Sequence, residues 1–147
     1  MKYRDESDGH RSFALPGARL QYGPDKLVDV LHIDLFLEPN VPERRLVGIC
    51  TTTVRALDEP VGMLTLDAID LEIESVRRDG APLQFVRRDG SLQICFEPAI
   101  APGEEAAFAV TYRANDPRHG LFFVEPSEAY PEKVAHAWTQ SQDQNAR

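Results

Sequence analysis

Apolar and polar residues alternate along much of this chain, and the first such stretch covers residues 31–38. Four aliphatic side chains are spaced two residues apart there, at Leu31, Ile33, Leu35 and Leu37. A period of two is that of a β-strand, whose successive side chains point to opposite faces. The stretch therefore predicts a strand with one buried, aliphatic face. Pro39 and Asn40 are expected to end this strand, because they favour turns.

Short apolar segments with strand-like composition recur along the rest of the chain. They cover residues 46–55, 63–66, 71–76, 83–85, 92–96, 108–112, 121–124 and 134–138. Two Asp-Gly pairs, at residues 79–80 and 89–90, are typical of tight hairpin turns. Gly48 lies in a segment rich in β-branched residues and indicates a bulge or a close approach of another chain segment. We find no amphipathic pattern that predicts a helix of three turns.

About eight or more short strands, separated by frequent turn signals, predict an all-β fold. We expect a twisted antiparallel β-sandwich or a saddle-shaped sheet over residues 20–147, after a flexible polar arm over residues 1–19. The length of 147 residues and the hydrophobic fraction of 42% fit one domain with a core of its own.

The charge and the cysteine content restrict the possible partners and compartments. A net charge of −8 argues against nucleic-acid binding, which needs a basic face. No apolar run approaches the roughly 18 residues of a membrane span, and the charged residues 1–12 lack the apolar part of a secretory signal. Cys50 and Cys95 are too few for a disulfide framework, so we expect buried free thiols in a cytoplasmic protein.

The sequence shows no recognisable catalytic or metal-binding motif. The four histidines, His10, His32, His119 and His136, do not form an H-E-x-x-H motif, and neither cysteine belongs to a C-x-x-C pair. We therefore expect no metal site and no catalytic site in this chain alone. His32 is predicted to face solvent from its strand, whereas His136 and Trp138 share a strand face and are predicted to pack.

The last residues form a polar segment directly after an apolar one. In Ala137–Arg147 (AWTQSQDQNAR), Gln140 and Gln142 would project on the same side of an extended chain. Their amide oxygens could accept hydrogen bonds from a ligand amine. The alternative is a polar loop that trails off the domain. Because the segment has no domain-ending signal, we expect the chemistry of a longer parent protein to lie beyond Arg147.

Read in order, these segments resemble a known domain. The order is VLHIDLFLE, LVGICTTTV, LTLDAIDLEIESV, LQICFEPAIAPGEEAAFAVTY, GLFF and AWTQSQDQNAR. It is similar to the N-terminal β domain of the zinc aminopeptidases of the aminopeptidase N and leukotriene hydrolase family, over about residues 20–147. The most specific part is the T-Q-x-[E/Q] segment followed by an arginine, which residues 139–142 and Arg147 match.

The resemblance implies a division of labour within a longer zinc aminopeptidase. A following catalytic domain would carry H-E-x-x-H, a further glutamate and the zinc, while this β domain covers one side of the active site. By position, Gln142 would contact the free α-amine of the peptide substrate, and Gln140 would line the pocket for its first side chain. Many family members have a glutamate in place of Gln142, so a neutral amide there would hold the amine less tightly.

Two other interpretations remain open. One is a non-catalytic scaffold relative that has lost the zinc motif, and the other is an unrelated β-sandwich binding module. A domain without its catalytic partner should expose an apolar patch and self-associate, whereas a self-sufficient module should protect its edges.

Overall fold

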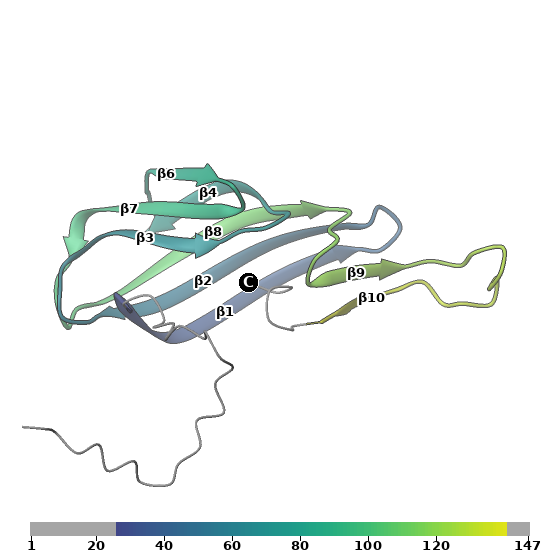
Figure 1. The fold of residues 1–147 in the computed structure, drawn as a ribbon, viewed down its shortest axis with the longest axis horizontal. Coiled ribbons are helices and arrows are strands. Elements are labelled where there is room, and N and C mark those ends of the chain that lie inside the picture. Colours follow the sequence, from purple (N-terminus) through teal and green to yellow (C-terminus); the bar gives the residue numbers. More distant parts are fainter. Residues whose placement is uncertain (1–25, 141–147) are drawn as a thin grey trace, which may run out of the picture.

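Residues 26–140, the part of the chain that the computed structural model describes, form ten β-strands (Figure 1). The strands are β1 (Val28–Asn40), β2 (Arg45–Ala56), β3 (Val61–Asp67), β4 (Glu72–Arg78), β5 (Ala81–Pro82), β6 (Phe85–Arg88), β7 (Ser91–Ile100), β8 (Glu105–Asn115), β9 (Leu121–Val124) and β10 (His136–Thr139). The predicted all-β class is confirmed. The expected arm over residues 1–19 lies outside the described residues.

The strands form three antiparallel sheets. The largest has five strands in the order β1-β2-β8-β4-β5, the second has three in the order β3-β7-β6, and β9 pairs with β10. In Figure 1 the three-stranded sheet lies over one end of the long strands, and the β9–β10 hairpin extends from the opposite end. The arrangement confirms the predicted β-sandwich, with one sheet much longer than the layer that covers it.

Both Asp-Gly pairs make the hairpin turns that the sequence predicts. Asp79 and Gly80 connect β4 to β5 with φ angles of 51° and 79°, and Asp89 and Gly90 connect β6 to β7 with 46° and 77°. Positive φ at both central residues is the mark of a type I′ turn, whose twist matches that of the flanking strands. The strand predicted around residues 83–85 is wrong in its bounds: Leu83 and Gln84 lie between β5 and β6, and only Phe85 belongs to a strand, as the first residue of β6.

The core lies where the two larger sheets overlap. Alternate residues of β2 and β8 face alternate residues of β7, and all have at most 6% of their surface exposed: Val54, Phe108, Val110, Leu92, Ile94 and Phe96. Phe96 and Phe108 meet edge to face, with ring centroids 5.6 Å apart. Such pairs add to the free energy that the burial of their area contributes. The overlap is therefore a well-packed core.

The aliphatic face of β1 departs from expectation. Leu35 pairs with Cys50 and Leu37 with Gly48, so these side chains continue the inner face of β2. Within the described residues Ile33, Leu35 and Leu37 nevertheless remain 54%, 54% and 44% exposed. The predicted strand is correct, but the predicted burial of its face is wrong here, because the three-stranded sheet does not reach across this part of β1. Leu31 lies in a register shift between Val30 and His32.

The cysteines are free, as expected, but neither is fully buried. Cys50 and Cys95 are both partly exposed. Cys50 lies on the inner face of the large sheet, and its Sγ is 3.5 Å from the hydroxyl of Thr52. The prediction of buried thiols is thus wrong in degree. The covering sheet leaves the inner face at Cys50 partly open, whereas Cys95 alternates with the buried Ile94 and Phe96 in β7 and so lies on the outer face of its sheet.

Candidate functional site

The β9–β10 hairpin carries the segment in which the sequence places the site. Thr139 pairs with Leu121, and the backbone N–H of Gln140 donates to the carbonyl of Gly120 at 3.0 Å. This bond extends the hairpin by one residue, so the backbone of Gln140 is held at the end of β10. Gln142 lies outside the described residues, and the expected alignment of the two glutamines remains a prediction.

The hairpin has one face turned toward the large sheet. Four hairpin residues line a pocket of about 280 Å³ together with Leu37, Pro39 and Leu46 of β1 and β2; they are Leu121, Ala137, Thr139 and, from the side, Trp138. Phe123, which pairs with Ala137, is only 6% exposed. The hairpin therefore lies beside the far ends of the long strands, with a small apolar pocket between them.

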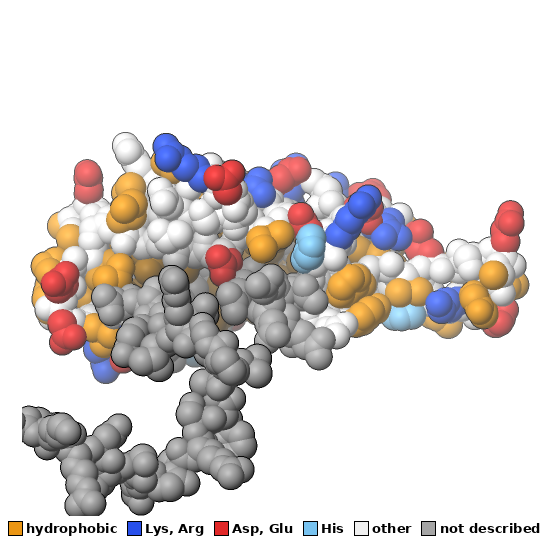
Figure 2. Space-filling model, in the orientation of Figure 1, with side chains coloured by type: hydrophobic (Ala, Val, Ile, Leu, Met, Phe, Trp, Pro, Cys, Tyr) orange, Lys and Arg blue, Asp and Glu red, His pale blue; other side chains and the backbone are white. Residues whose placement is uncertain are grey.

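The opposite face of the hairpin is aromatic and partly open. Phe122 and Trp138 pair across the two strands and stack with ring centroids 4.6 Å apart. His136 is exposed and donates from Nδ1 to the carbonyl of Val134 at 2.7 Å. Hydrophobic side chains reach the surface along this hairpin (Figure 2). Side-chain alternation continued from Trp138 places Gln140 on the same face.

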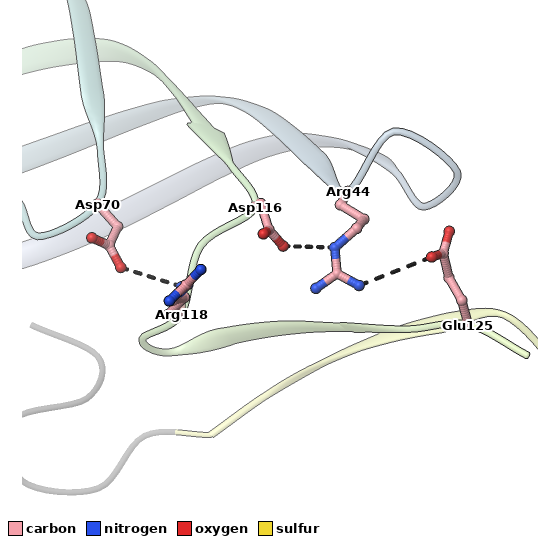
Figure 3. A network of polar contacts seen from close by, with 5 residues as sticks. All are labelled: Arg44, Asp70, Asp116, Arg118 and Glu125. Carbon is pink, nitrogen blue, oxygen red and sulfur yellow. Dashed lines mark hydrogen bonds and ion pairs between the residues drawn. The ribbon is translucent and has the colours of Figure 1, made fainter. Parts of the chain in front are cut away.

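Two carboxylates hold the connection between β8 and the hairpin (Figure 3). Asp70, in the turn between β3 and β4, accepts on one oxygen from the backbone N–H of Arg118 at 3.2 Å and pairs with His119 Nδ1 at 2.7 Å. Asp116 accepts from Arg44 Nε at 2.6 Å. The Arg44 guanidinium also lies 4.0 Å from Glu125, just after β9.

The electrostatics of Asp70 follow from these contacts. The hydrogen bond with His119 lowers the pKa of the Asp70 carboxyl most, and the N–H of Arg118 lowers it further. Bonds that favour the charged form hold a carboxylate ionised. Asp70 is therefore a charged acceptor at neutral pH.

Sequence reasoning does not find this network. Asp70 is 49 residues from His119, and Arg44 is 72 residues from Asp116. Asp70 also has a positive φ of 57°, a conformation in which aspartate is enriched and which suits a turn. A turn aspartate is so common that it carries no signal of a long-range role.

An open apolar groove lies between the hairpin end of the large sheet and the edge of the three-stranded sheet. It has a volume of about 570 Å³ and is lined mainly by apolar side chains, among them Ile33, Leu35, Leu66, Leu71 and Tyr112. Burial raises the pKa of the Tyr112 hydroxyl, with a further contribution from Cys50. The groove is thus the exposed continuation of the core.

No group of three or more His, Cys, Asp and Glu side chains within residues 26–140 is arranged to hold a metal ion. The same part of the chain contains no helix that is long and apolar enough to cross a membrane.

Comparisons with known proteins found one matching family model and several solved structures with a similar fold. Residues 29–147 match the family model of the peptidase M1 N-terminal domain. An M1 zinc metallopeptidase from Deinococcus radiodurans is 27% identical, with a TM-score of 0.54 over 60% of this chain and 20% of that one. A mutant of a two-domain M1 zinc metallopeptidase bound to L-tryptophan is 26% identical, with a TM-score of 0.56 over 62% and 21%.

Yeast LTA4 hydrolase in complex with bestatin shares the fold at 21% identity, with a TM-score of 0.57 over 72% of this chain and 19% of that one. A search of curated proteins found no match. The chain spans about a fifth of the length of the solved structures that it resembles. Because the family model covers most of the chain, this protein belongs to the peptidase M1 N-terminal domain family.

Proposed function

We propose that this chain is the N-terminal domain of a zinc aminopeptidase, a metallopeptidase that removes N-terminal residues from peptides. Its role would be to cover one side of the active site and to contact the α-amine of the substrate through Gln142, with Gln140 beside it. The observation that carries the proposal is the hairpin that fixes the backbone of Gln140 at the end of β10, in a chain of the M1 family.

The chemistry of recognition supports this role. An aminopeptidase must detect a terminal ammonium, and an amide oxygen can accept a charge-assisted hydrogen bond from it. A segment fixed by β-pairing holds such an acceptor at a constant distance from the reacting bond, which is how positioning contributes to rate.

The zinc would be bound by another part of the protein. Catalytic zinc sites take three protein ligands and leave one position open, and the described residues offer no such group. Zinc, when bound by the parent enzyme, would supply metal-assisted hydrolysis of the peptide bond. This domain would supply binding and shape only.

The open apolar groove and the aliphatic face of β1 support a second part of the proposal. Apolar surface of this kind marks an interaction site, and the catalytic domain of the same protein is the partner that we propose for it. The free cysteines agree with a cytoplasmic location, because disulfides are rare there.

Substitution of Gln142 in the full-length protein that carries this chain tests the proposal. We expect Gln142→Ala to lower kcat/KM for peptides with a free amino terminus by a factor that corresponds to about 1.5–3 kcal/mol, as for a hydrogen bond to a charged group. Gln93→Ala is the control, because Gln93 lies in β7 on the outer face of the three-stranded sheet. Steady-state kinetics with aminoacyl chromogenic substrates provide the measurement.

Equal effects of the two substitutions would remove the site assignment. Residues 1–147 supplied with zinc should show no turnover, and hydrolysis at enzyme-like rates would contradict the division between the domains. A full-length protein that binds peptides but hydrolyses none in the presence of zinc would instead support the non-catalytic scaffold.

A further inference from the structure

We propose that Asp70 is a positioning residue for Gln140. Its carboxylate, contributed by the turn between β3 and β4, fixes the segment 118–120 against which the last residue of the hairpin pairs. This inference rests on the proposed function, since it assigns to Asp70 the placement of the substrate-contacting segment.

The first step is the contact of Asp70 with two consecutive residues. The N–H of Arg118 and Nδ1 of His119 both meet Oδ2, at 3.2 and 2.7 Å (Figure 3 draws the contact with Arg118). A carboxylate oxygen that accepts two donors holds both in a fixed relation, and hydrogen bonds to an ionised acceptor are stronger than neutral ones. Residues 118 and 119 are thereby tied to the turn that follows β3.

The second step leads from His119 to Gln140. The N–H of Leu121 donates to the carbonyl of His119 at 2.8 Å across Gly120, whose φ is 73°. This is the geometry of a γ-turn with positive φ, which is rare and which glycine can adopt because it has no Cβ. The carbonyl of Gly120 then accepts the N–H of Gln140 at 3.0 Å. The orientation of that carbonyl depends on a tight turn that Asp70 holds on its N-terminal side.

The third step concerns why the β9–β10 hairpin needs an anchor near Gly120. The β9–β10 hairpin forms a sheet of only two strands, and a two-stranded hairpin is marginal in water unless it packs on something else. Arg44 contacts Asp116 and Glu125, which lie four and five residues from Gly120 along the chain. Asp70 acts directly beside Gly120. Because a misplacement of about 1 Å can cost about a hundredfold in rate, an anchor at this point sets how well the segment meets its substrate.

The positive φ of Asp70 guides the choice of variants. Asp70→Gly removes the carboxylate without straining the folded backbone, since glycine accepts positive φ freely, and Asp70→Asn keeps an acceptor oxygen and tolerates the same φ. Asp89→Gly is the matched control. Asp89 also has a positive φ, 46°, in a turn, and its carboxylate makes no hydrogen bond or ion pair with any other residue of 26–140.

Two measurements test the proposal. Amide hydrogen exchange on the 147-residue chain should show at least tenfold faster exchange at Gln140 and Leu121 in Asp70→Gly, while the buried strand β7 keeps its protection. In the full-length protein, Asp70→Gly should lower kcat/KM about 10- to 100-fold, mostly through KM. Asp70→Asn should keep most of the exchange protection and most of kcat/KM. Asp89→Gly should change neither the exchange at Gln140 nor kcat/KM. If Asp70→Gly folds poorly, His119→Ala replaces it as the test. This variant removes the shorter contact and should have the same effects on exchange and on kcat/KM.

Unchanged exchange at Gln140 in both Asp70→Gly and His119→Ala would overturn the proposal. So would unchanged kinetics in Asp70→Gly while Gln142→Ala lowers kcat/KM. If Gln142→Ala has no effect but Asp70→Gly still accelerates exchange at Gln140, the proposed function fails, and the structural role of Asp70 is supported.

Discussion

At the scale of single residues, Gly48 shows how closely the inner face of the large sheet is fitted. It lies in β2 opposite Leu37 of β1 and Tyr112 of β8. A Cβ at this position would lie 2.6 Å from Tyr112 Cζ and 3.0 Å from Leu37 Cδ2. Tyr112 therefore leans over a site that has no side chain, which is the close approach that the sequence predicts for Gly48. The tyrosine forms part of the wall of the apolar groove.

We expect Gly48→Ala to lower the free energy of unfolding by about 1–3 kcal/mol, because the added methyl group forces the Tyr112 ring to move. Gly62→Ala is the control, since a Cβ there meets nothing closer than 3.9 Å, and it should be neutral or slightly stabilising. Urea denaturation of the 147-residue chain provides the measurement. In a Tyr112→Ala background the cost of Gly48→Ala should shrink, and a cost that stays the same would show that the ring is not its cause.

At the scale of elements, β1 differs from the strands that form the core. The alternation of its residues is as regular as that of β7, yet within the described chain only Val28 of β1 is buried, with 8% of its surface exposed. In β7 the residues Leu92, Ile94 and Phe96 are each at most 2% exposed. The two strands have the same pattern and different environments, because β7 is the middle strand of the covering sheet and β1 lies at the edge of the large sheet.

Truncation of one leucine on each strand should reveal this difference. Leu92→Ala is expected to destabilise the 147-residue chain by about 2–5 kcal/mol, as for a buried leucine that leaves a cavity. Leu35→Ala, at a position 54% exposed, should cost about 1 kcal/mol or less. Chemical denaturation measures both. Comparable losses would mean that the β1 face is covered in the chain in solution.

At the scale of the whole molecule, the long sheet extends beyond the layer that covers it. The three-stranded sheet covers one end, the hairpin contacts the other, and the apolar groove of about 570 Å³ lies between them. The formal net charge of −8 opposes association between copies, whereas the exposed aliphatic face favours it. The balance of these two forces decides the solution behaviour of the chain.

We expect the 147-residue chain to self-associate at high concentration, and more strongly as salt screens its charge. Leu35→Glu should shift it toward the monomer, because the new carboxylate lies on the inner face. Phe36→Glu adds the same charge to the opposite face, at a position 59% exposed, and should have a smaller effect. Analytical ultracentrifugation measures the change. A larger effect of Phe36→Glu would place the contact on the outer face instead.

The sequence by itself determined the features that depend on neighbouring residues. The period of two located the strands, the Asp-Gly pairs located two type I′ turns, and the order of segments indicated the family that the comparison supports. The strands and the turns are each set within about ten residues, where side-chain alternation and turn geometry act.

Only the tertiary structure decided which faces are covered and which residues meet. Periodicity shows that Leu35 and Leu92 lie on apolar faces, but burial depends on which sheet lies above each of them. The contact of Asp70 with His119 and the fit of Tyr112 over Gly48 join segments that are 49 and 64 residues apart, respectively. Such contacts follow from the order of the strands and from their packing, and a local sequence pattern determines neither.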